Sequence, residues 1–171
     1  MNKGKRIVLT GFMGVGKSSV GRHLAQILKA ERIDLDFYIE KNENRKIAEI
    51  IDTDGEDGYR AIESSNLQRL LEESDAQVIS LGGGTWTVAA NRELIKQSGL
   101  TTVWLESTFE HCWYNIKFSH KERPLARDKQ KAKSLFDDRQ KLYCLADWHF
   151  VIKPEYTSHD IAKMIHEEYF S

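Results

Sequence analysis

Eight residues near the N-terminus have the spacing of a phosphate-binding loop. The run from Gly11 to Ser18, Gly-Phe-Met-Gly-Val-Gly-Lys-Ser, satisfies the pattern G-x-x-x-x-G-K-[ST], and it lies between an apolar run and a helical pattern, as that motif requires. Glycines allow a tight turn that directs backbone N–H groups at phosphate oxygens, and the helix dipole adds to this field. We expect Lys17 to reach the β- and γ-phosphates of a nucleotide and the Ser18 hydroxyl to bind Mg²⁺.

A phosphate-binding loop occurs in switch GTPases, ATPase motors and small-molecule kinases, so other residues must distinguish these classes. Residues 52–55, Asp-Thr-Asp-Gly, fit the D-x-x-G pattern of GTPases, but we expect them in a polar loop without a preceding apolar strand. The chain has no N-K-x-D sequence that would bind guanine. The apolar run 78–81 continues into Gly82, Gly83 and Gly84, where a motor would place an acidic residue. The sequence therefore favours a small-molecule kinase.

Two carboxylates lie at the end of the second candidate strand. Asp34 ends the run 32–34, and Asp36 follows two residues later. In an open α/β sheet the carboxyl end of this strand faces the same crevice as the phosphate-binding loop. If the segment stays extended, both side chains point the same way, so that one anchors Mg²⁺ and its waters while the other accepts the proton of an attacking hydroxyl. The alternative is a pair that caps a helix.

Arginines and glycines further along the chain are candidates for an acceptor site. Arg60 begins a long helical pattern, where its alternative role is an exposed pair with Glu63. Three consecutive glycines after a core strand, residues 82–84, are entropically costly and indicate a close approach of the backbone to a ligand. Arg139 could return to the same crevice from the last long helical pattern but one.

A basic stretch covers residues 117–141, with 9 basic and 4 acidic side chains. Most of these residues are expected to form solvated helix faces. Arg123 differs from them because it precedes Pro124, whose fixed φ marks a non-helical segment between two helices. A cation in such a segment could close over bound phosphates.

Composition limits the partners of the chain. Lys and Arg number 25 against 26 Asp and Glu, a net charge of −1, which gives no global basic field for nucleic acid or an anionic membrane. Cys112 and Cys144 form no close-spaced pair, which suits a reducing compartment. The apolar run 7–9 is too short for a signal or a membrane span. We expect a cytoplasmic monomer that acts on small molecules.

Short β-branched apolar runs alternate with helical patterns along the chain. The runs are residues 7–10, 32–34, 78–81, 101–105 and 150–152. This alternation predicts one α/β domain with a parallel sheet covered by helices on both faces.

Ser107, followed three residues later by Glu110, predicts a capping box at the start of one helix.

Seven sequence segments, taken together and in their order along the chain, resemble the shikimate kinase family. This family belongs to the nucleoside monophosphate kinase-like P-loop proteins. The resemblance covers nearly the whole chain and rests on G-F-M-G-V-G-K-S-S-V-G-R, D-L-D-F-Y-I-E, G-E-D-G-Y-R-A-I-E, G-G-G, the pair Asn91-Arg92, R-P-L-A, and R-Q-K-L-Y followed by A-D. It implies a three-layer sandwich around a five-stranded parallel sheet of order 2-3-1-4-5. It also implies a single domain over residues 1–171, with a substrate-binding helical region at about 35–75 and a lid at about 117–128.

The activity implied by this resemblance is ATP-dependent phosphorylation of the 3-hydroxyl of shikimate, with Mg²⁺. The residues implied to hold ATP are Gly14, Val15, Gly16, Lys17, Ser18, Ser19 and Arg123. Those implied to hold shikimate are Asp36, Arg60, Gly82, Gly83, Gly84 and Arg139, the two arginines by a bidentate clamp on its carboxylate. Ser18 and Asp34 would lie at the metal. Lys17, Asp36 and Arg123 would be catalytic.

Two positions depart from the family pattern, and two other functions remain open. Tyr59 stands where phenylalanine is usual, which adds a hydroxyl. Asn115 lies near a position where an arginine commonly packs on adenine, and Lys117 is the candidate substitute. The first alternative function is a P-loop kinase for another hydroxylated carboxylic acid, such as gluconate. The second is a catalytically weak nucleotide-binding regulatory module.

Overall fold

A parallel sheet forms the centre of the computed structural model, which describes residues 4–121 and 123–171. Its strands are β1 (Ile7–Thr10), β2 (Arg32–Asp34), β3 (Val78–Ser80), β4 (Thr101–Glu106) and β5 (Trp148–Val151). In the described part of the chain these five strands pair in the order β2-β3-β1-β4-β5, which confirms the predicted topology. The last strand begins two residues earlier than predicted, at Trp148.

The middle strand, β1, holds the sheet together. Ile7 pairs with Val78 on one side and with Thr101 on the other. Ile7, Val8 and Leu9 have no exposed surface. An uninterrupted apolar strand of this kind is expected where helices cover both faces of a parallel sheet.

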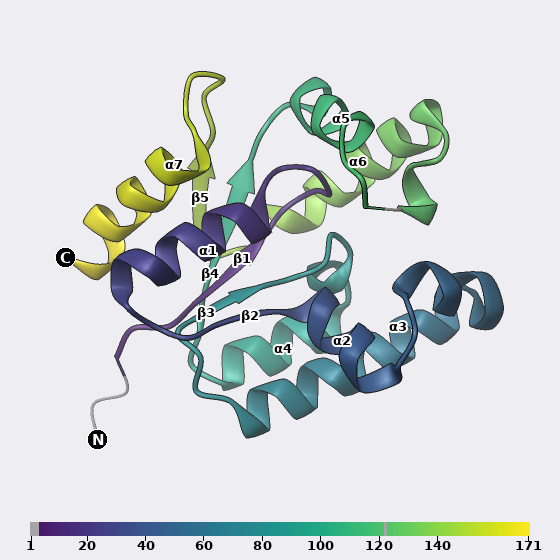
Figure 1. The fold of residues 1–171 in the computed structure, drawn as a ribbon, viewed down its shortest axis with the longest axis horizontal. Helices are drawn as coiled ribbons and strands as arrows, with labels where there is room; N and C mark the ends of the chain where they lie inside the picture. Colours follow the sequence, from purple (N-terminus) through teal and green to yellow (C-terminus); the bar gives the residue numbers. More distant parts are fainter. Residues whose placement is uncertain (1–3, 122) are drawn as a thin grey trace.

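Helices cover both faces of the sheet, as Figure 1 shows. They are α1 (Lys17–Leu28), α2 (Leu35–Glu43), α3 (Ile47–Glu73), α4 (Ala89–Gln97), α5 (Phe109–Lys117), α6 (Lys129–Tyr143) and α7 (Ser158–Ile165), with short turns at Thr85–Thr87, Pro124–Ala126 and His166–Phe170. α1 and α7 lie side by side on one face, and α3 and α4 lie on the other. None of these helices, within the residues described, is both long and apolar enough to cross a membrane.

Connections at the carboxyl edge of the sheet carry most of the predicted site residues. The loop after β1 runs into α1, Asp34 ends β2, and the glycine triplet follows β3. This edge is where open α/β sheets bind ligands. The segment between α5 and α6 contains Arg123 and Pro124, which confirms the predicted break between two helices. Glu122, within the predicted lid, lies outside the described residues.

Two local predictions are wrong. Residues 52–55 were expected in a polar loop but belong to α3, which is interrupted at Gly55 by a positive φ of 79°. The predicted capping box of α5 at Ser107 is absent, since β4 runs to Glu106 and the helix begins one residue later than expected. Thr108 is the cap, and its hydroxyl accepts from the backbone N–H of His111 at 3.2 Å.

Close packing of α1 on β3 positions the start of α1. A Cβ added to Gly21 would lie 2.6 Å from the Ser80 hydroxyl oxygen. That hydroxyl is buried and donates to the Lys17 carbonyl oxygen at 3.2 Å. Glycine at this position therefore allows the helix to reach the strand while the hydroxyl stays bonded to the first turn of α1.

We expect Gly21→Ala to lower the free energy of unfolding by about 1–3 kcal/mol, because overpacking outweighs the gain of about 1 kcal/mol in helix propensity. Gly21→Ala combined with Ser80→Ala should recover most of this loss, since the clashing oxygen is then gone. Urea denaturation of both variants measures this, with Gln26→Ala on the exposed face of α1 as control. An unchanged stability of Gly21→Ala would contradict the packing argument.

Candidate active site

Two adjoining cavities open at the carboxyl edge of the sheet. One, of about 1010 Å³, lies between the phosphate-binding loop, α2, α3 and the segment after α5. The other, of about 370 Å³, surrounds the phosphate-binding loop and reaches α5 and the start of α7. The residues that border both are Met13, Ser18, Asp34, Asp36, Gly82, Gly83, Lys121 and Arg123. Groups bound in the two cavities would therefore meet at this shared border.

The phosphate-binding loop has the backbone geometry that its glycines predict. Gly14 and Gly16 have positive φ values of 81° and 107°. A Cβ at Gly14 would also lie 2.5 Å from the carbonyl oxygen of Cys112. The Lys17 ammonium turns into the loop and donates to the carbonyl oxygens of Gly11 and Phe12, at 2.6 and 3.0 Å. The loop thus holds a cation at its centre.

Burial strongly disfavours the charge on Lys17. Its side chain lies inside the loop, and desolvation lowers its pKa to about 8, against the opposing effect of Asp36. Lys121 and Arg123 lower this pKa further, so the three cations are close enough to repel one another. A bound anion would relieve this repulsion and raise the pKa of Lys17.

Asp34 links the phosphate-binding loop to the second cavity. The Ser18 hydroxyl donates to Asp34 Oδ2 in a short contact, and Asp34 Oδ1 accepts from the backbone N–H groups of Asp36 and Phe37 at 3.1 and 3.4 Å. The segment does not stay extended: Asp34 caps α2, as in the stated alternative, and Asp36 lies in the first turn of that helix. Both carboxylates nevertheless border both cavities.

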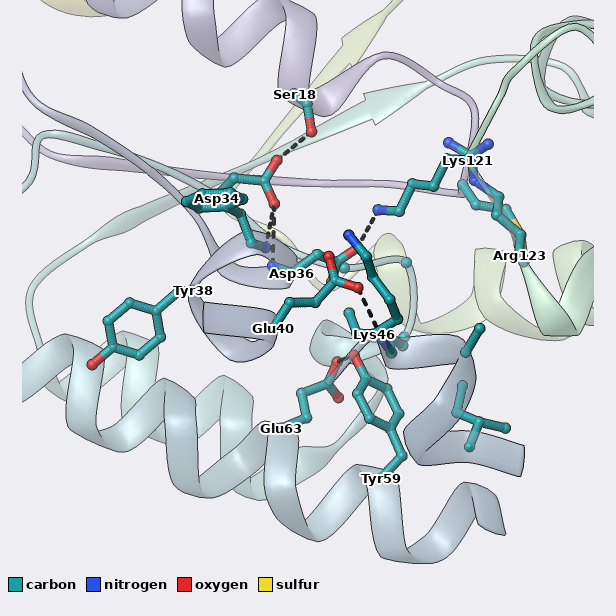
Figure 2. Close-up of a pocket in the computed structure, with 18 of the residues that line it drawn as sticks. Ser18, Asp34, Asp36, Tyr38, Glu40, Lys46, Tyr59, Glu63, Lys121 and Arg123 are labelled. Atoms are coloured by element: carbon teal, nitrogen blue, oxygen red, sulfur yellow. Dashed lines mark hydrogen bonds and ion pairs between the residues drawn. The ribbon is translucent and has the colours of Figure 1, made fainter. Parts of the chain in front are cut away.

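A lysine from the segment after α5 contacts Asp36. Lys121 Nζ lies 2.8 Å from Asp36 Oδ2, and Figure 2 shows its side chain reaching across the cavity beside Arg123. Lys121 was predicted only as part of the lid and was not among the predicted site residues, although it lies two residues before Arg123. Arg123 is partly buried, which lowers its pKa, and its Nη1 atom is buried without a hydrogen-bond partner among the described residues.

Arg60 is held by a buried carboxylate. Its Nη1 donates to Glu63 Oε1 at 2.7 Å, and Glu63 has no exposed surface. The other oxygen of Glu63 accepts from Tyr59 at 3.2 Å and from Thr85 at 2.9 Å. Burial acts to lower the pKa of Arg60, but the charge and hydrogen bond of Glu63 outweigh it and raise that pKa. The predicted i,i+3 pair therefore exists, and it orients Arg60 at the cavity wall rather than on an exposed face.

The glycine triplet leaves room for the charged groups around it. A Cβ at Gly82 would lie 2.7 Å from Asp36 Oδ1, and one at Gly83 would lie 3.1 Å from Arg139 Nη1. A Cβ at Gly84 would overlap the Arg60 guanidinium. The triplet therefore lies close to the side chains that form the cavity wall, and its predicted close approach to a ligand stays a prediction.

Arg139 reaches the same cavity from α6. It is 6% exposed, and burial lowers its pKa, partly offset by Tyr143. The Tyr143 hydroxyl donates to the Gly83 carbonyl oxygen, so it connects α6 to the glycine triplet. Tyr143 was missed in the sequence, although its i,i+4 spacing from Arg139 indicated a shared helix face. The two guanidinium groups are close enough for Arg60 to lower the pKa of Arg139.

The smaller cavity has different walls on its far side. It is lined there by His111 and Asn115 of α5 and by Tyr156, in the segment between β5 and α7. The Asn115 side chain donates to the Gly14 carbonyl oxygen at 2.8 Å and so joins α5 to the phosphate-binding loop. Lys117, the predicted substitute for an adenine-packing arginine, does not line this cavity.

The sheet order, the phosphate-binding loop after β1 and a second cavity that shares its border define a P-loop kinase for small molecules. A family model described as Shikimate kinase matches residues 13–169. A curated shikimate kinase from Streptococcus thermophilus is 40% identical over 139 residues, which cover 80% of this chain and 83% of the relative. The chain belongs to the shikimate kinase family and is thus an ATP-dependent kinase.

Solved structures agree with this assignment. Shikimate kinase from Acinetobacter baumannii, solved in complex with shikimate, has a TM-score of 0.87 at 34% identity and covers 96% of this chain and 92% of its own. A gluconokinase from Sinorhizobium meliloti has a TM-score of 0.56 at 16% identity, over 99% and 98% of the two chains. At that identity it shows only a common fold, so the gluconate alternative is not favoured.

The lowered pKa of Lys17 predicts a pH-dependent stability. Between pH 8 and 10.5 the unfolded chain would keep the proton that the folded chain has lost, so stability rises with pH in this window. We expect wild type to gain about 3 kcal/mol of unfolding free energy relative to Lys17→Met between pH 7.5 and 10.5. Denaturation of both proteins at each pH measures the difference. A constant difference would show that Lys17 titrates normally.

Proposed function

We propose that this chain transfers the γ-phosphoryl group of ATP to the 3-hydroxyl of shikimate, giving shikimate 3-phosphate and ADP. The observation that carries the proposal is the shared border of the two cavities. At this border a carboxylate, Asp36, lies between a phosphate-binding loop and a cavity walled by a buried arginine, Arg139, and a partly buried one, Arg60. This arrangement suits a phosphate donor on one side and a hydroxylated carboxylic acid on the other.

On the acceptor side, Arg60 and Arg139 bind the carboxylate of shikimate. A planar guanidinium can hold a carboxylate with two parallel hydrogen bonds, and both groups already lie at the cavity wall. Gly82, Gly83 and Gly84 line the ring, because they border this cavity and a Cβ at any of them would crowd the charged groups around it. Asp36 accepts hydrogen bonds from the hydroxyls.

On the donor side, the phosphate-binding loop holds ATP. The residues that we assign to the phosphates are Gly14, Val15, Gly16, Lys17, Ser18, Ser19 and Arg123. Backbone N–H groups at the start of α1 and the helix dipole attract the phosphates. The buried Lys17 ammonium gains most from their charge, because burial has already removed its water.

Magnesium suits the donors next to this loop. The Ser18 hydroxyl and the Asp34 carboxylate are in contact and face both cavities, and hard oxygen ligands of this kind are those that Mg²⁺ prefers. Ser18 and Asp34 would hold the ion together with waters and phosphate oxygens. When bound, it neutralises charge on the phosphates.

The chain's own side chains carry out the transfer. As the 3-hydroxyl oxygen forms its bond to the γ-phosphorus, the bond from that phosphorus to the bridging oxygen breaks, and its electron pair leaves with ADP. Asp36 takes the proton of the hydroxyl. Lys17 and Arg123 stabilise the charge on the phosphoryl oxygens in the transition state.

The proposal keeps one domain over residues 1–171, with the acceptor bound mainly by the region 35–75 and a lid over residues 117–128. We assign the enzyme to the cytoplasm, which two free cysteines, Cys112 and Cys144, support. We assign it as a monomer whose site is complete within one chain.

A coupled assay of ADP release tests the function directly. With ATP and Mg²⁺, we expect turnover with shikimate, little with its methyl ester and none with gluconate. Turnover with gluconate but not shikimate would establish the first alternative. Tight ATP binding without turnover on any acceptor would support a regulatory module.

We expect Arg60→Ala and Arg139→Ala to weaken shikimate binding by about 30-fold or more, because truncating one partner of a buried charge pair costs about 2 kcal/mol or more. ATP affinity should stay within a few-fold of wild type. Calorimetry with each ligand measures both, and Arg69→Ala, an exposed arginine of α3 paired with Glu73, is the control. Lost ATP affinity with unchanged shikimate affinity would reverse the assignment.

Arg123→Ala should lower kcat by about 100-fold and leave both KM values nearly unchanged, because its contact with the phosphoryl group is made mainly in the transition state. Steady-state kinetics at saturating ATP and shikimate measure this. Lys129→Ala, at the start of α6 and away from both cavities, is the control. Nearly full turnover of Arg123→Ala would mean that Arg123 only forms a surface contact.

A further inference from the structure

Lys121 lies where the donor and acceptor cavities meet. It belongs to the segment between α5 and α6, yet its ammonium is 2.8 Å from Asp36, 85 residues earlier in the chain. It borders both cavities, as Arg123 does. Among the described residues that border both, Lys121 and Arg123 carry the positive charges.

The contact of Lys121 with Asp36 is easily exchanged. The Lys121 side chain is 48% exposed and that of Asp36 is 21% exposed. Ion pairs with this exposure are weakly held because water competes for both charges. Lysine also has a flexible four-carbon stem that can turn to a new partner without movement of the backbone.

Charge around Lys121 favours an anionic partner. Lys121 and Arg123 both act to lower the pKa of Lys17, so three cations gather around one point. Arg123 in addition has a buried Nη1 atom without a hydrogen-bond partner in the described part of the chain. Like charges held this close repel one another until an anion binds between them. A phosphoryl group that crosses from one cavity to the other passes this point.

We propose that Lys121 is a further catalytic residue, which leaves Asp36 when the acceptor hydroxyl binds there and then contacts the phosphoryl group during transfer. The proposal rests on the function proposed above. The hydroxyl oxygen bonds to the γ-phosphorus, its proton goes to Asp36, and the electron pair of the broken bond leaves with ADP. Lys121 forms no bond and stabilises the negative charge on the phosphoryl oxygens. It also lowers the repulsion between those oxygens and Asp36.

Kinetics of three variants test this role. Lys121→Met keeps the length of the side chain and removes its charge, and we expect kcat to fall tenfold or more while the KM for ATP changes little. Lys121→Arg should recover at least a third of wild-type kcat. Lys96→Met, an exposed lysine in the last turn of α4 that lines neither cavity, should match wild type.

Binding of a transition-state analogue provides a measurement independent of turnover. In the presence of shikimate and Mg²⁺, ADP with aluminium fluoride mimics the phosphoryl group in transfer. Lys121→Met should bind this complex at least tenfold more weakly than wild type does, by calorimetry, and should bind ADP alone equally well. A purely structural role would weaken both or neither.

Two outcomes would overturn the proposal. If Lys121→Met lowers the KM for shikimate and leaves kcat unchanged, Lys121 only competes with substrate for Asp36. If neither constant changes, the ion pair is a surface contact without a role. Both results require a wild type that phosphorylates shikimate, so they are distinct from a failure of the proposed function, in which wild type itself would be inactive.

Discussion

Positive charge held away from water is the constraint on which the rest of this structure depends. Lys17 and Arg139 are buried and Arg123 is partly buried, and burial lowers the pKa of each. A folded chain loses stability when it desolvates charges without anions to match them. Here the cations are gathered around two adjoining cavities, where the phosphates and the carboxylate of two anionic substrates would supply the missing negative charge.

The fold contributes the groups that make such burial tolerable. Carbonyl oxygens of the phosphate-binding loop accept from Lys17, and the buried carboxylate of Glu63 pairs with Arg60. Tyr59 and Thr85 donate to the other oxygen of Glu63, so this carboxylate has partners on both sides. Because a parallel sheet brings the carboxyl ends of β1, β2 and β3 to one edge, these groups lie together without long loops.

Glycine is the second requirement, and it follows from the first. The guanidinium and carboxylate groups of the cavity wall lie against the backbone of the glycine triplet after β3. This close packing at the wall leaves the cavity itself open. At Gly82 and Gly84 a single Cβ would displace Asp36 or Arg60. At Gly21 the same absence of a side chain lets α1 lie against β3, where the Ser80 hydroxyl donates to the Lys17 carbonyl oxygen. The cavity therefore depends on glycines without side chains as much as on the charged groups.

Features with a strong local pattern were predictable. The strands follow from apolar runs, and the phosphate-binding loop follows from a motif whose glycines can adopt the positive φ values that the turn needs. The sheet order was implied by the family resemblance. Predictions that depended on one residue of register were less accurate. Thr108 rather than Ser107 caps α5, and of the two readings left open for Asp34, an extended segment or a helix cap, the structure has the cap. Caps are decided by the residue at which the preceding strand ends, and hydrophobic patterning determines that only to within a residue or two.

By itself, the sequence determined the fold class, the phosphate-binding loop and the candidates Asp36, Arg60, Arg123 and Arg139, because residue type and spacing along the chain carry that information. Only the tertiary structure decided which groups touch. Lys121 meets Asp36 across 85 residues, and Tyr143 reaches Gly83 across 60. Such pairs leave no local pattern, since they depend on how helices from distant parts of the chain pack against one sheet edge. The partners of the buried charges were therefore visible only once the chain was folded.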